Sequence, residues 1–91
     1  MLECTLVSPL TQVELKKVTA VYVRAVTGEL GILSAHASMV CRLADNSTVR
    51  VMDDSGEHRY RVGANGFLRV RSDQVVILSA EIEESADPSL D

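Results

Sequence analysis

The sequence predicts an all-β fold, a two-layer β-sandwich of about eight to ten short strands. Three observations carry this prediction. Apolar and polar residues alternate with a period of two along most of the chain, and turn-forming residues interrupt the alternation at roughly 8–12-residue intervals. Val, Ile and Thr, which favour strands, are plentiful, and no segment shows the apolar stripe of a helix.

The first strands follow from this alternation in order. Leu2, Cys4 and Leu6 alternate with polar residues, which predicts a strand over residues 2–6, ended by a turn at Ser8-Pro9. Strands are then expected over residues 11–15 and 18–26. Residues 27–38, TGELGILSAHAS, contain two glycines and break the pattern, so we expect an ordered loop there. Such a loop is either a contact surface or a crossover whose leucines fold into the core.

The second half of the chain repeats the strand-and-turn pattern. Strands are expected over residues 39–43, 48–52, 57–62, 67–71 and 75–78. The last of these is apolar on both faces, which predicts a strand that is covered on both sides or lies at the centre of the sandwich. We expect the sandwich domain to span residues 1–82 and residues 83–91 to form an acidic, flexible tail.

Length and charge exclude several classes of function. The chain has 91 residues, enough for one domain, and a net charge of −4. Residues 1–80 carry eight acids and nine bases, so the body lacks the basic excess of a nucleic-acid-binding domain. The three aromatic residues are too few for a stacking platform. No apolar run reaches the roughly 20 residues of a membrane span, and no targeting leader is evident.

No catalytic or metal-binding motif is present in the sequence. A nucleophile–base pair could be imagined from Ser34 and His36, but small residues close together in a loop often produce such pairs by coincidence. Cys4 and Cys41 are expected to be buried free thiols, because a metal site needs more ligands at tighter spacing. The sequence therefore predicts a protein that is not an enzyme, with no catalytic residues, cofactor or metal.

Four arginines form a second pattern. Arg59 and Arg61 precede Arg69 and Arg71 on the next expected strand, and Phe67 has the same strand parity. If the two strands form a hairpin, the five side chains share one face and could meet an acidic partner. The alternative is a solvated face balanced by nearby acids such as Glu57 and Asp73.

Several segments, in order, resemble one known family. GELGIL at residues 28–33, followed by His36-Ala37, resembles the GELGILPGHAP loop of the epsilon subunit of F-type ATP synthases. Residues 7–9, 18–23, 48–51, 66–70 and 74–78 resemble the strands and turns of the same N-terminal β-sandwich domain. The sequence departs from the family at Ser34-Ala35, where Pro-Gly is usual, and at Arg24-Ala25, where Pro-Gly is common.

The resemblance implies a non-catalytic subunit of the central rotor stalk. It links the gamma subunit to the membrane c-ring and couples ion-driven rotation to ATP synthesis, at the cytoplasmic face of the bacterial inner membrane. It would be a monomer within the complex, without nucleic acid, and associated with the membrane only through the complex. The positions implied to face the c-ring are Glu29, Leu30, Gly31, Ile32 and His36.

Two alternatives remain open at this point. Family members continue into a C-terminal helical hairpin, whereas this sequence ends in the acidic segment, so we expect a naturally short or a trimmed epsilon subunit. The other class of function is a stand-alone β-sandwich adaptor or ligand-binding module.

Overall fold

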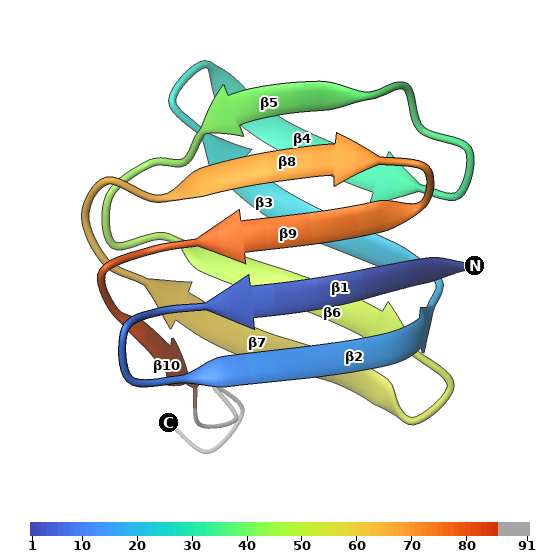
Figure 1. Ribbon diagram of the computed structural model, residues 1–91, viewed down its shortest axis with the longest axis horizontal. Coiled ribbons are helices and arrows are strands. Elements are labelled where there is room, and N and C mark those ends of the chain that lie inside the picture. The colour runs from blue at the N-terminus through green and yellow to red at the C-terminus, as the bar shows by residue number, and fades with distance from the viewer. Residues whose placement is uncertain (86–91) are drawn as a thin grey trace.

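The computed structural model describes residues 1–85 and contains ten strands in two stacked sheets (Figure 1). This confirms the predicted all-β sandwich, and no helix occurs within residues 1–85. The strands are β1 (Leu2–Val7), β2 (Gln12–Val18), β3 (Ala20–Ala25), β4 (Gly28–Leu33), β5 (Met39–Arg42), β6 (Thr48–Asp53), β7 (Gly56–Val62), β8 (Phe67–Arg71), β9 (Gln74–Leu78) and β10 (Ile82–Glu84).

Each sheet has five strands. Sheet A has the order β2-β1-β9-β8-β5, and sheet B has the order β10-β7-β6-β3-β4. All neighbouring strands are antiparallel except β1 and β9, which are parallel. In Figure 1 sheet A lies in front of sheet B, and the edge strands β5 and β4 lie on the same side of the sandwich.

The core lies between the sheets and is made by alternate residues of every strand. Inward side chains are buried and outward ones are exposed, as the period of two predicts. The largest fully buried side chains are Leu2, Leu6, Ile32, Leu43, Leu68 and Ile77. Burial of these aliphatic side chains between the sheets stabilises the sandwich. The side chains on the two outer faces are not part of this core and can contact a partner.

The segment 28–33 is a strand, β4, and the predicted loop over residues 27–38 is wrong for this half of it. A tight turn at residues 26 and 27 brings β4 antiparallel to β3, and Gly28 adopts a φ of +137°, which favours glycine. Gly31 lies opposite Tyr22, and a Cβ at Gly31 would be 3.1 Å from Cε1 of that ring. Glycine at this position therefore leaves room for the aromatic side chain of the neighbouring strand.

Strand β9 lies at the centre of sheet A and faces the core on one side only, so the prediction of a strand covered on both sides is wrong. Val75 and Ile77 are fully buried, whereas Leu78 is 48% exposed on the outer side. The expected tail over residues 83–91 begins inside β10, because Glu83 and Glu84 pair with β7. Residues 86–91 of that tail lie outside the described residues.

Candidate functional site: the two outer faces

The two arginine pairs lie on opposite outer faces, so the predicted four-arginine hairpin face is wrong. Arg59 and Arg61 belong to β7 in sheet B, whereas Arg69 and Arg71 belong to β8 in sheet A. The connection over residues 63–66 crosses from one sheet to the other instead of closing a hairpin. A period of two places a side chain on the inner or outer side of its strand, but it does not say which sheet the strand joins.

The sheet B arginines have acidic partners. The Arg59 guanidinium donates to the carboxylate of Glu57, which also lies 3.4 Å from Nη1 of Arg50. Arg61 lies 3.5 Å from the carboxylate of Glu83. The hydrogen bond from Arg59, followed by the charges of Arg59 and Arg50, lowers the pKa of Glu57 despite an opposing effect of desolvation. The solvated, balanced alternative therefore describes this pair.

The sheet A arginines lie beside exposed apolar side chains. None of the ion pairs within residues 1–85 involves Arg69 or Arg71. Arg69 is paired in register with Val40, and Phe67 is paired with Leu78. These apolar residues are well exposed: Val40 is 66%, Phe67 46% and Leu78 48% accessible. We call the set Val40, Phe67, Arg69, Arg71 and Leu78 the sheet A patch.

Asp73, the acid expected near these arginines, has a different contact. One of its carboxylate oxygens accepts a 2.8 Å hydrogen bond from the backbone N–H of Ala35. This bond connects the β8–β9 turn to the turn that follows β4. An apolar surface flanked by two arginines without acidic partners in the described chain is suited to a partner that is both apolar and acidic.

The alternation of β4 divides the positions predicted to face the c-ring. Glu29 and Gly31 are exposed on the outer side, whereas Ile32 is fully buried in the core and Leu30 packs partly buried against it. Ile32 is therefore a core residue, and its side chain cannot contact a partner in this fold. His36 follows the opposite end of β4 from Glu29, beyond the extended stretch from residue 29 to residue 33, which is about 13 Å long. The structure brings together only Glu29 and Gly31 of the predicted set.

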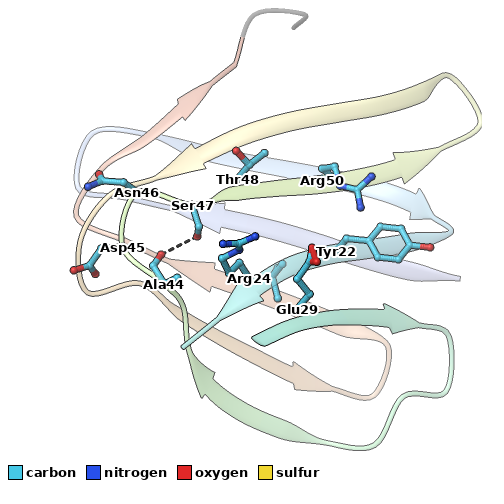
Figure 2. Close-up of a pocket in the computed structure, with 10 residues that line it drawn as sticks. Tyr22, Arg24, Glu29, Ala44, Asp45, Asn46, Ser47, Thr48 and Arg50 are labelled. Carbon is cyan, nitrogen blue, oxygen red and sulfur yellow. Dashed lines mark hydrogen bonds between the residues drawn. The ribbon is translucent and has the colours of Figure 1, made fainter. Parts of the chain in front are cut away.

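A polar cleft of about 430 Å³ lies on the outer face of sheet B beside Glu29 (Figure 2). It is formed by β3, the start of β4, and the segment that leads into β6. Its lining residues are Tyr22, Val23, Arg24, Glu29, Ala44, Asp45, Asn46, Ser47, Thr48 and Arg50. We call this feature the sheet B cleft.

One wall of the sheet B cleft is a stacked group of three residues. The Arg50 guanidinium carbon lies 4.9 Å from the centroid of the Tyr22 ring, a cation–π distance. The ring also lies over Gly31, which is its register partner on β4. Arg50 is held in turn by Glu57, so the guanidinium has a defined position at the rim of the cleft.

Backbone hydrogen bonds fix the opposite wall. The N–H of Ala44 donates to the carbonyl of Arg24 at 2.9 Å, and the N–H of Asn46 donates to the carbonyl of Gly63 at 3.2 Å. The Ser47 hydroxyl closes the turn by donating to the carbonyl of Ala44 at 2.7 Å, which Figure 2 shows as a dashed line. The cleft therefore has one wall of stacked side chains and one wall of hydrogen-bonded backbone.

A cluster of polar side chains that was not predicted from the sequence lies at the β6–β7 hairpin. The Ser55 hydroxyl donates to Asp53 at 2.7 Å, and Nε2 of His58 lies 3.0 Å from the same carboxylate and 3.2 Å from the Ser55 oxygen. Ser55 and Asp53 thus meet the same ring nitrogen, whereas a nucleophilic relay needs the base to contact them through different nitrogens. The cluster fixes the hairpin, and the DDSG turn followed by His58 was the available signal.

The remaining predicted chemistry concerns thiols and metals. Cys4 is fully buried, and desolvation raises the pKa of its thiol to about 12. Cys41 is only partly buried, which corrects the prediction for that residue. Within the part of the chain that the structure describes, no group of His, Cys, Asp or Glu side chains is arranged to hold a metal ion. No helix among those residues is long and apolar enough to cross a membrane.

These features define a small two-sheet β-sandwich with two unlike outer faces and no arrangement of catalytic groups among residues 1–85. The profile of the family "ATP synthase, Delta/Epsilon chain, beta-sandwich domain" matches residues 1–85, so the chain belongs to this family. The match covers every strand of both sheets.

Curated relatives agree with this assignment. The chain is 40% identical over 75 residues to the ATP synthase epsilon chain of Mycobacterium avium (strain 104), covering 75% of this chain and 61% of the relative. It is 40% identical over 74 residues to that of Mycobacterium leprae (strain TN), covering 78% of this chain and 60% of the relative. The chain thus matches less than two thirds of the length of these relatives.

Solved structures share the fold at low identity. A chain of the Euglena gracilis mitochondrial ATP synthase, in an OSCP/F1/c-ring structure, superposes with a TM-score of 0.81 at 24% identity, covering 98% of this chain and 57% of that one. A chain from the central stalk/c-ring structure of the Tetrahymena thermophila enzyme gives a TM-score of 0.72 at 13% identity, covering 90% of this chain and 65% of that one.

Proposed function

We propose that this protein is a non-catalytic rotor subunit of an F-type ATP synthase, which joins the gamma subunit to the c-ring at the cytoplasmic face of the membrane. The observation that carries the proposal is the family match over the whole sandwich. A subunit of this kind transmits torque through contacts and needs no bond chemistry of its own. The two solved structures that share the fold, an OSCP/F1/c-ring structure and a central stalk/c-ring structure, are complexes of this type.

The two outer faces support a division of the proposed contacts. The sheet A patch combines exposed apolar area with two arginines that form no ion pair within residues 1–85, which suits a large and lasting interface such as one with the gamma subunit. The outer side of sheet B near Glu29 is polar and suits the hydrophilic loops of a membrane ring. We assign Arg69, Arg71 and Phe67 to the gamma contact, and Glu29 and Gly31 to the ring contact.

His36 and Leu30 take different parts in this proposal. His36 lies beyond the far end of β4, where its Nδ1 is 2.7 Å from the carbonyl oxygen of Ala37. It is therefore placed away from the ring contact. Leu30 packs partly buried against the core and so anchors the part of β4 that carries Glu29.

Cysteine cross-linking in the assembled synthase tests the proposal. We expect Glu29→Cys to cross-link to a cysteine in the polar loop of the c-subunit, and Phe67→Cys to cross-link to the gamma subunit. Leu10→Cys, on a residue that is 97% exposed in the β1–β2 turn, serves as the accessible control. If the position 29 cross-link is absent from membranes that retain coupled activity, the assignment of the ring contact is wrong.

A further inference from the structure

We propose that the sheet B cleft receives a polypeptide loop carrying a carboxylate next to a cation, with Arg24 binding the carboxylate and Glu29 the cation. The inference rests on the proposed function, in which Glu29 faces the c-ring. It adds a second charged contact, Arg24, at a position where the resemblance offers no guide, because Pro-Gly is common there in the family.

The register of β3 and β4 places Arg24 beside Glu29. Arg24 is the direct cross-strand partner of Glu29, and both side chains are exposed on the outer face. Figure 2 shows the two side chains on the same side of the sheet, at the cleft. Yet no ion pair within residues 1–85 joins them or involves either one. Their opposite charges lie side by side and remain available to a ligand.

A carboxylate that enters the cleft meets groups whose positions are already fixed. Arg50 lines the same cleft and is fixed by the Tyr22 ring and by Glu57. The opposite wall is held by the backbone hydrogen bond from Ala44 to Arg24. Fixed donors lose little conformational freedom on binding, so more of the interaction appears as affinity.

The sheet B cleft is poorly suited to a nucleotide or another polyphosphate. The Arg50 guanidinium already covers one face of the Tyr22 ring, so a base cannot stack on that face. Glu29 and Asp45 line the cleft and repel phosphate groups. A ligand that carries both signs of charge fits both Arg24 and Glu29, and a polypeptide loop is the class of ligand that presents such pairs.

A charge exchange tests this inference in the assembled synthase. The double variant Arg24→Glu, Glu29→Arg keeps the net charge and the composition of the cleft but reverses the order of its charges. We expect it to bind epsilon-depleted synthase membranes about tenfold more weakly than the parent chain, because two attractive contacts become repulsive. Circular dichroism and the thermal midpoint establish that the variant is folded.

The matched control is an equivalent exchange on the same sheet face. Arg61 and Glu83 form an exposed ion pair at 3.5 Å between β7 and β10, outside the cleft. The double variant Arg61→Glu, Glu83→Arg should bind within about twofold of the parent, because it alters charge order at a site without a partner. A tenfold loss in this control as well would overturn the assignment of the effect to the cleft.

The two proposals fail in different ways. If the position 29 cross-link forms and the cleft exchange leaves affinity within about twofold of the parent, the inference is wrong and the proposed function stands. If the cross-link does not form and the parent chain does not bind the membranes, both are wrong. If inorganic phosphate shifts the NMR signals of Arg24 and Arg50 while the exchange leaves membrane binding unchanged, the cleft is a free-anion site and the inference is overturned.

Discussion

The outer faces of the two sheets use arginine in opposite ways. On sheet B, Arg59 and Arg61 are paired with Glu57 and Glu83, so their charges are balanced within the domain. On sheet A, Arg69 and Arg71 form no ion pair within residues 1–85 and lie beside exposed Phe67. The same Arg-x-Arg pattern therefore stabilises one surface and leaves the other ready for a partner. The difference lies in the residues around each pair, which the Arg-x-Arg pattern does not specify: acidic residues of β7 and β10 on sheet B, and exposed apolar residues on sheet A.

The largest expected effect comes from damage to the core that supports both faces. Ile32→Ser should destabilise the domain by about 3–5 kcal/mol, because it creates a cavity and buries a hydroxyl. Leu33→Ser, one residue on and 56% exposed, should cost less than about 1 kcal/mol. Urea denaturation measures both free energies of unfolding. Equal losses would contradict the inward and outward alternation of β4.

The next effect separates the faces directly. Arg69→Glu with Arg71→Glu should weaken binding to the gamma subunit by about tenfold while changing the free energy of unfolding by less than about 0.5 kcal/mol. The matched pair Arg59→Glu with Arg61→Glu should lower the thermal midpoint and leave gamma binding unchanged, because Glu57 and Glu83 lose their partners. Isothermal titration with purified gamma subunit measures the affinities. The opposite result would exchange the roles of the two faces.

A smaller effect sharpens the comparison through pH. Arginine lowers the pKa of Glu57 from its ordinary 4.5, and hydrogen bonds from Ser55 lower the pKa of Asp53 from 3.8. Because folded carboxyls with depressed pKa values bind protons less readily than unfolded ones, their stabilisation is present above the ordinary values and is lost as pH falls through the folded values. Thermal midpoints measured across this acidic range should fall less in Glu57→Gln than in the parent. An unchanged acid dependence would show that the Glu57 ion pairs contribute nothing to stability.

The smallest expected effect concerns Gly31. Gly31→Ala brings a methyl group to about 3.1 Å from the Tyr22 ring, which must shift, while alanine reduces the entropy lost on folding. The two effects oppose each other, so the net change should be within about 1 kcal/mol. Gly28→Ala, at a φ of +137°, should cost more than this because the backbone conformation itself is strained. Thermal unfolding of both variants decides the order.

Most of the fold could be predicted because inner and outer positions alternate along each strand. Strand β4 was not predicted because GELGIL contains two glycines, and glycine is rare in strands. Glycine is accommodated at position 31 because the Tyr22 ring of the neighbouring strand occupies the space of a side chain there. The arginine face was wrong because the connection after β7 changes sheets. The sheet B cleft joins residues 22–29 to residues 44–50, and no local pattern indicates that these two segments meet.

The parallel pairing of β1 with β9 has a consequence for how the chain is made. Glu3 lies opposite Gln74, so β1 leaves the ribosome long before this neighbour does. Until then β1 can pair only with β2, and the backbone groups of its other edge have no partner strand. Closing so long a loop is slow, because its entropy must be lost before the contacts form. Sheet A is thus completed only after β9 has emerged, and β1 is the strand that most needs protection from aggregation in that interval.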